Sequence, residues 1–128
     1  MASPARAGAL IYAKDLSRLS VFYQKLFSMR LLYSDEEHHI IESDDMQLII
    51  HAIPEYISSS IVISSPPEQR SEQAIKLFFT VPSITGAGSV ASSFGGSLFG
   101  QEYTGPGFLV RNGYDPEGNI FQVREFSP

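Results

Sequence analysis

Short runs of alternating apolar and polar residues, typical of β-strands, make up most of this 128-residue chain. In the first half the pattern predicts four strands, over 8–14, 30–33, 38–42 and 46–52. The first of these is mostly apolar, so we expect it to be buried on both faces. It is followed by apolar residues at helical spacing, which predict a helix capped by Asp15 or Ser17 and running to about Phe27. The side chains expected to face the core are Leu16, Leu19, Phe22, Tyr23 and Leu26.

The same order of elements recurs, more faintly, in the second half. After a loop-like segment over 54–73, the pattern predicts a strand over 74–81 and a short helix over 85–94, ended by Gly95-Gly96. Three further strands are predicted, over 97–103, 108–114 and 119–126. Each half therefore reads strand, helix, strand, strand, strand. This internal repeat predicts two modules, about 8–53 and 74–126, joined by the connector over 54–73.

A tight turn, Asp115-Pro116-Glu117-Gly118-Asn119, precedes the last predicted strand. We expect Asp115 to cap this turn with its side chain and Gly118 to adopt a positive φ. In the strand itself, Ile120, Gln122 and Arg124 share one face. A polar side chain in mid-strand beside an apolar neighbour is a candidate pocket wall, so Gln122 marks the predicted site.

Length, charge and cysteine usage exclude several classes of protein. A chain of this length forms one domain, and a net charge of -5 without a basic stripe argues against a nucleic-acid surface. The absence of cysteine excludes disulfides, thiolate metal sites and a cysteine nucleophile. Residues 1–7 lack the apolar core of a signal peptide, and no run approaches the roughly 18–20 apolar residues that span a bilayer. We therefore expect a soluble, cytoplasmic protein with no membrane or nucleic-acid partner.

Two motifs resemble the vicinal oxygen chelate superfamily, which includes glyoxalases, bleomycin-resistance proteins and extradiol dioxygenases. The segment from Asp15 to Phe27 (DLSRLSVFYQKLF) is similar to the family's opening D-L-x-x-S-x-x-F-Y-x-x-x-L-G, although Phe27-Ser28 stands where Leu-Gly is usual. The turn from Asp115 to Asn119 is similar to its closing D-P-x-G-N, so the resemblance covers nearly the whole chain. It implies an α+β fold in which two βαβββ modules form a curved, mixed eight-stranded sheet around a cavity. It also implies a homodimer.

The resemblance further implies where enzymes of the superfamily hold a divalent metal, with His, Glu or Gln on the first and last strands of each module. Those positions carry Gly8, Gln47, Lys76 and Gln122 in this chain. Glycine has no ligand atom, and a lysine ammonium has donors but no acceptor. The two amides are weak ligands without an anionic partner. We therefore expect neither a metal nor a cofactor at these positions, with recruitment of a metal through His51 or a shifted register as the alternative.

A small organic molecule is the ligand that these side chains then suggest. Lys76 shares a face with Phe78 and either holds an anionic or enolate-like group or extends to solvent. Arg124 offers a bidentate fork for a carboxylate, or is solvated. His51 shares a face with Gln47 and is expected to be a hydrogen-bonded wall of the cavity. The predicted ligand-binding residues are Gln47, His51, Lys76, Phe78, Gln122 and Arg124.

The other two histidines, His38 and His39, are adjacent and therefore point to opposite faces of a strand, so they cannot clamp one ion together. No Ser/His/Asp arrangement stands out for nucleophilic catalysis. The sequence thus favours a metal-independent binding protein of the sequestering or resistance type. The alternatives are a lyase, isomerase or dioxygenase of the same superfamily, with a recruited metal or with Lys76 stabilising an anionic intermediate. A third possibility is an interaction module whose cavity is vestigial.

Overall fold

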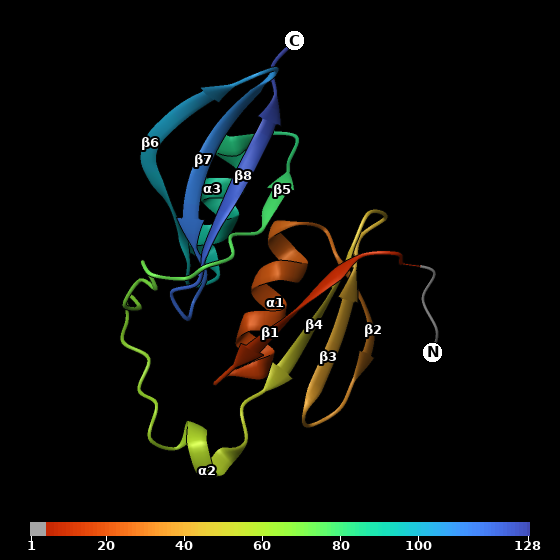
Figure 1. Cartoon of the computed structure of the whole chain (residues 1–128), viewed down its shortest axis with the longest axis vertical. Coiled ribbons are helices and arrows are strands. Elements are labelled where there is room, and N and C mark those ends of the chain that lie inside the picture. The colour runs from red at the N-terminus through yellow and green to blue at the C-terminus, as the bar shows by residue number, and fades with distance from the viewer. Residues whose placement is uncertain (1–4) are drawn as a thin grey trace. The chain divides into compact units, whose positions relative to one another are not determined.

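Two compact units, divided between Ile63 and Ser64, make up the computed structural model, which describes residues 5–128. Each unit contains one four-stranded sheet with a helix along one face (Figure 1). The first unit holds β1 (Gly8–Ala13), α1 (Leu16–Leu26), β2 (Arg30–Ser34), β3 (His38–Glu42), β4 (Gln47–Ala52) and the one-turn helix α2 (Glu55–Ser58). The second holds β5 (Phe78–Thr80), α3 (Ile84–Ser93), β6 (Ser97–Gly105), β7 (Phe108–Tyr114) and β8 (Ile120–Phe126).

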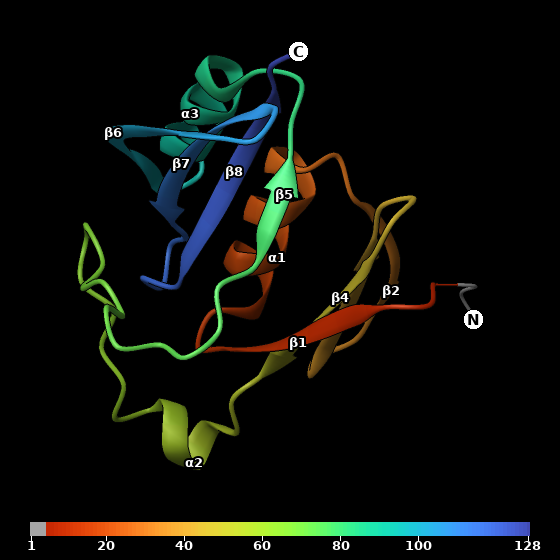
Figure 2. The same cartoon turned by 45° about the horizontal axis from the view of Figure 1, so that its top comes forward.

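The two sheets have the same topology. The strand order is β1-β4-β3-β2 in the first and β5-β8-β7-β6 in the second, with a parallel pair at one edge and antiparallel pairs elsewhere. Figure 2 shows the short β5 beside β8 at the edge of the second sheet. The predicted α+β class and the two βαβββ modules are confirmed. The eight strands form two separate four-stranded sheets, and the predicted cavity stays a prediction.

The core of the first unit lies between α1 and its sheet, as the helical spacing predicted. Asp15 caps α1, because its Oδ1 accepts a hydrogen bond from the backbone N–H of Arg18 at 3.1 Å. The buried face of the helix carries Leu19, Phe22, Tyr23 and Leu26, and the buried strand residues are Ile41, Leu48 and Ile50. Ser20 is also buried in this helix, where it binds His39 of β3.

Burial of the first strand on both faces was predicted wrongly. Residues of β1 are alternately covered and exposed, with Leu10 46% and Tyr12 59% exposed. The reason is that β1 is an edge strand and α1 covers only the face that carries the buried core of the sheet. The side chains of Leu10 and Tyr12 therefore lie outside the core of this unit, although the strand is mostly apolar.

The fifth strand is shorter than predicted, three residues in place of the segment over 74–81. It pairs only with β8, in a three-residue parallel ladder. Before the ladder begins, the Gln73 side chain replaces a strand: its Nε2 donates to the carbonyl of Ile120 at 2.6 Å, and its Oε1 accepts from the N–H of Ile120 at 2.9 Å. One side chain thus satisfies the backbone groups that a longer strand would have paired.

The turn before β8 has the structure that its sequence predicted. Asp115 is fully buried, and its Oδ1 accepts from the backbone N–H groups of Glu117 at 2.9 Å and Asn119 at 3.0 Å. Gly118 has a φ of 86°, and a Cβ there would collide with the backbone of Glu68 in the connector. The turn therefore fixes both the start of β8 and the course of the connector within the second unit. Among residues 5–128, no helix is long and apolar enough to cross a bilayer.

Candidate functional site

Four of the six predicted ligand-binding residues lie together in the second unit, on the face of its sheet opposite α3, here called the distal face of the second sheet. The strand register pairs Phe78 with Gln122, and Val110 with Arg124. Residues that alternate with these, such as Phe121 and Val123, are buried on the other face. The alternation that the sequence predicted for β8 thus places Gln122 and Arg124 beside Phe78.

The guanidinium of Arg124 is held at the centre of this face by aromatic and amide contacts. Its carbon Cζ lies 3.9 Å from the centre of the Phe78 ring and 5.7 Å from that of Phe108. Its Nε donates to Oε1 of Gln122 at 3.2 Å. Among residues 5–128, Gln122 is the hydrogen-bond partner of this guanidinium, and the bond uses Nε. The two terminal nitrogens are therefore available to bind the oxygens of an anion.

Lys76 supplies the second positive charge on the distal face. It precedes β5 and is exposed, and its Nζ donates to Oδ1 of Asn112 at 3.3 Å. Asn112 is the register partner of Gln122, so the ammonium lies on the same face as Arg124 and the two amides. The sequence left open whether Lys76 extends to solvent or faces the predicted site. In the structure its side chain is exposed and is also directed towards Asn112 on the distal face.

Carboxylates are absent from this face in the described strands β5, β7 and β8. Glu125 of β8 alternates to the other face, where its Oε1 accepts from the N–H of Ile84 at the start of α3 at 2.7 Å. Arg111 of β7 also alternates away, and its Nε lies 3.4 Å from Oε1 of Glu102. The face accordingly presents two cations, two amides and aromatic rings, a combination that favours an anion with an apolar body.

The remaining predicted residues, Gln47 and His51, lie on β4 of the first unit, on the face opposite α1. Gln47 pairs with Gly8 of the edge strand, and its Nε2 donates to Oε1 of Glu42 at 3.4 Å. Glu42 is buried and lies 3.6 Å from a terminal nitrogen of Arg30. His51 is hydrogen-bonded as expected, with its Nδ1 2.8 Å from the carbonyl oxygen of Ala52.

Glu42 is a residue that the sequence interpretation missed. The resemblance implied a ligand position on the fourth strand, at Gln47, and no carboxylate occurs between Met46 and Ala52. The signal lay in the third strand instead: the tight turn over 43–46 joins an antiparallel pair and sets Glu42 opposite Gln47. Asn112 was missed in the same way, because its importance arises from its position opposite Gln122.

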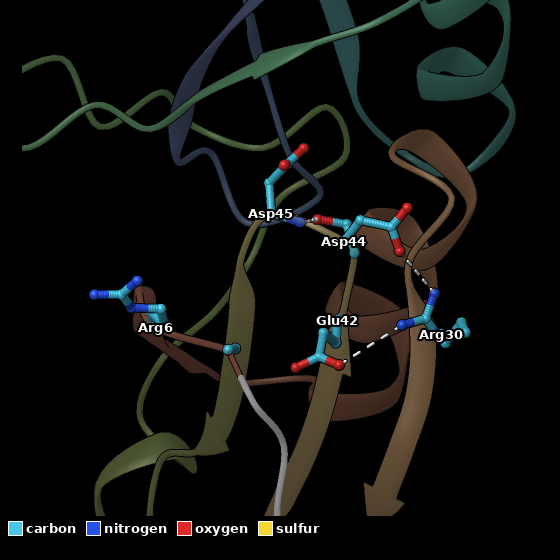
Figure 3. Close-up of a pocket in the computed structure, with 7 residues that line it drawn as sticks. Arg6, Arg30, Glu42, Asp44 and Asp45 are labelled. Carbon is cyan, nitrogen blue, oxygen red and sulfur yellow. Dashed lines mark hydrogen bonds and ion pairs between the residues drawn. The ribbon is translucent and has the colours of Figure 1, made fainter.

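A polar pocket of about 370 Å³, not predicted from the sequence, lies at one end of the first sheet (Figure 3). Its lining residues are Ala5, Arg6, Arg30, Glu42, Ser43, Asp44 and Asp45. Arg30 bridges two of its carboxylates, Glu42 at 3.6 Å and Asp44 at 3.5 Å, as the dashed lines in Figure 3 show. A neighbouring pocket of about 220 Å³ extends along Arg6 to Gly8 and Gln47. Opposite charges line the larger pocket, so it lacks the uniform charge that would select one class of ion, and Arg6 is the charged residue that lines the smaller one.

The positions at which the resemblance implies a metal do not fit a divalent cation. The backbone N–H groups of Gln47 and Gln122 donate to Ala7 and Leu77 in the same way, so the register makes Phe78, and not Lys76, the counterpart of Gly8. Neither glycine nor phenylalanine offers a ligand atom, and the nearby Glu42 is paired with Arg30. Within residues 5–128, no group of three or more His, Asp or Glu side chains is placed to hold a metal ion. Two neutral amides alone are a poor donor set for such a charge.

Known structures with the same fold span nearly the whole chain, although the sequence matches no protein-family model and no curated protein. A glyoxalase/bleomycin resistance protein/dioxygenase family enzyme from Burkholderia phytofirmans PsJN is 18% identical, with a TM-score of 0.73 over 95% of this chain and 98% of that one. A glyoxalase/bleomycin resistance protein from Albidiferax ferrireducens T118 is 14% identical, with a TM-score of 0.66 over 93% and 96%. The fosfomycin resistance protein FosX from Listeria monocytogenes is 16% identical, with a TM-score of 0.67 over 99% and 96%. The chain therefore has the glyoxalase/bleomycin-resistance-like fold, consistent with the resemblance seen in its motifs.

Proposed function

We propose that this protein binds a small organic anion on the distal face of the second sheet, without a metal, as a sequestering or resistance-type protein. The observation that carries this proposal is the position of Arg124, stacked 3.9 Å over Phe78 and bonded through Nε to Gln122. A guanidinium fixed in this way has lost much of the rotational freedom that binding would otherwise remove. It is therefore prepared to bind an anion at low entropic cost.

The surrounding groups define the chemical class of the ligand. Two terminal guanidinium nitrogens match a planar carboxylate or a phosphonate bidentately. Lys76 adds a second charge, and the amides of Asn112 and Gln122 can orient polar substituents. The exposed ring of Phe78 offers a surface for an apolar or aromatic body. An aromatic carboxylate or phosphonate combines these properties.

The fold accords with a binding function of this kind, since its structural neighbours include proteins named for bleomycin and fosfomycin resistance. We further expect the protein to act in the cytoplasm as a homodimer, a state that light scattering on the purified protein measures directly. Gln47 and His51 belong to the other unit and remain part of the predicted ligand-binding set.

Nuclear magnetic resonance with benzoate tests the proposal, and benzamide provides a neutral ligand of nearly the same shape. We expect benzoate to shift the Nε–H resonance of Arg124 and the side-chain amides of Asn112 and Gln122, and benzamide to shift them far less. Arg124→Gln should abolish the shifts of the Asn112 and Gln122 amides. Arg18→Gln, at an exposed position on α1, should leave them unchanged. Equal responses to both ligands, or benzoate binding retained in Arg124→Gln, would refute the assignment.

An enzymatic role is the alternative, and it depends on Lys76 stabilising an anionic intermediate. Its ammonium is exposed and donates to Asn112, so it is placed to reach a bound anion. Turnover of a hemithioacetal or a catechol, lost in Lys76→Met, would favour this alternative. Binding of benzoate without any turnover of these substrates favours sequestration.

A further inference from the structure

Two histidines face each other on neighbouring strands of the first sheet, outside the positions that the family resemblance assigns to a metal. His38 of β3 and His51 of β4 are direct register partners, with ring centres 4.4 Å apart and planes 71° apart. His39 points to the opposite face, where its Nδ1 lies 2.8 Å from Oγ of Ser20. The prediction that His38 and His39 point to opposite faces is therefore confirmed. His38 instead contacts His51 on the neighbouring strand.

The hydrogen bonds of the two rings determine which nitrogens can bind a metal. Nδ1 of His51 lies 2.8 Å from the carbonyl oxygen of Ala52, and a carbonyl only accepts, so Nδ1 carries the proton and Nε2 the lone pair. Nδ1 of His38 lies 3.3 Å from Oδ1 of Asp35. A carboxylate is also an acceptor, so it favours the proton on Nδ1 and leaves the lone pair on Nε2. An oxygen acceptor on the second nitrogen is the arrangement found behind metal-binding histidines.

The carboxylate behind His38 is itself held firmly. Oδ1 of Asp35 accepts from the backbone N–H groups of Glu37 at 2.8 Å and His38 at 2.7 Å, and Oδ2 accepts from the hydroxyl of Tyr33 at 2.6 Å. On the other side, the ring of Tyr12 packs 5.4 Å from that of His51. Both imidazoles are thus restrained by neighbours, while His38 keeps about a third of its side chain exposed to solvent.

The distance between the rings favours one coordination geometry. Two imidazoles that bind one ion at about 2.0 Å, with the bonds roughly 90° apart, have ring centres about 4.5 Å apart. At a tetrahedral angle the separation grows to about 5.2 Å. The observed 4.4 Å matches the first value. A right angle between imidazoles is the geometry of tetragonal copper(II) and nickel(II) sites, whereas zinc prefers the tetrahedral one.

We propose that His38 and His51 form a two-histidine site for a divalent transition-metal ion, with copper(II) bound more tightly than nickel(II) and nickel(II) more tightly than zinc. The ion is bound by the two Nε2 atoms, and water fills the other positions. Two neutral imidazoles suit these borderline ions and discriminate against magnesium and calcium, which require oxygen ligands. The site lies in the first unit, and neither histidine is among the residues that contact Arg124.

Titration with copper(II), nickel(II) and zinc chloride, followed by calorimetry, tests the order of affinity and the 1:1 stoichiometry. Electron spin-echo spectroscopy of the copper complex counts the bound imidazoles, and we expect two. His38→Asn and His51→Asn should each reduce the count to one and lower the affinity about tenfold or more. His39→Asn is the matched control, since it removes the adjacent imidazole on the other face and should preserve both signals.

A measurement on the unaltered protein guards against variants that fail to fold. In long-range nitrogen–proton spectra, zinc should shift Nε2 of His38 and His51 and leave both nitrogens of His39 unchanged. A single bound imidazole in the copper complex, an affinity unchanged by both His38→Asn and His51→Asn, or zinc shifts confined to His39 would each overturn the site. Zinc bound more tightly than copper would overturn the proposed order of affinity.

Discussion

Replacement of Asp115 is expected to be among the most destabilising changes in this chain. The carboxylate is fully buried, and it accepts hydrogen bonds from the backbone N–H groups of Glu117 and Asn119 and from Nδ2 of Asn119 at 2.8 Å. Asp115→Ala leaves all three donors without this acceptor. A buried donor left unsatisfied costs about 1–3 kcal/mol. Since Asn119 is half-buried and water reaches part of it, the expected total is about 3–5 kcal/mol.

Asp115→Asn provides a graded comparison, because its remaining oxygen can still accept from both backbone N–H groups. Its new NH₂ group would face the NH₂ group of Asn119, so only one of the three bonds is lost. We expect a cost of about 1–3 kcal/mol. Asp44→Ala removes an aspartate whose side chain is 93% exposed and should change the free energy of unfolding by less than about 0.5 kcal/mol.

Urea unfolding followed by far-ultraviolet circular dichroism measures these differences, since the chain has no tryptophan for fluorescence. Equal slopes of the free energy against urea would show that the variants unfold from the same compact state. A loss of less than about 1 kcal/mol in Asp115→Ala, or no difference from Asp44→Ala, would refute the role assigned to the buried carboxylate.

Two further substitutions and one pH dependence test other parts of the structure. Gly118→Ala should cost about 2 kcal/mol or more in thermal or urea unfolding, because the positive φ is unfavourable for alanine and its Cβ meets connector backbone; a neutral effect would contradict this. Gln73→Ala should destabilise the second unit by about 1–2 kcal/mol and speed amide exchange at Ile120, and unchanged exchange would count against it. The Tyr33 hydroxyl, which donates to Asp35, holds the pKa of that carboxyl well below its ordinary 3.8. The contribution of the Asp35 carboxylate to the free energy of unfolding should therefore be fully present above pH 3.8 and be lost as pH falls through the lowered pKa of the folded state. Nuclear magnetic resonance of the Asp35 carboxyl carbon measures this pKa, and titration at the ordinary value would contradict the prediction.

Sequence patterns predicted elements wherever local chemistry alone decides the structure. The helical stripe and Asp15 located α1, and the turn that begins at Asp115 located the start of β8. Burial depends in addition on which strand becomes an edge, and an apolar run does not contain that information. This is why β1 was expected to be covered on both faces, although Tyr12 is exposed.

The part of the candidate site that could be predicted is the part that depends on the alternation of side chains along a single strand. Alternation in β8 placed Gln122 and Arg124 on one face, and the structure adds that Phe78 lies beneath the guanidinium. Pairs across strands, such as Glu42 with Gln47, depend on register, which is set by turns and by the whole sheet. The histidine pair was missed for the same reason, since the sequence separates its members by 13 positions.

The close spacing of β1 and β4 limits which residues can occupy position 8. A side chain at Gly8 would bring its Cβ within 2.5 Å of the carbonyl oxygen of Gln47, closer than real atoms approach. A larger residue there would therefore require the edge strand to shift outward. A single substitution at Gly8 is expected to strain the pairing of β1 with β4 before it could present a metal-binding side chain, so a designed metal centre would be easier to build elsewhere on this sheet.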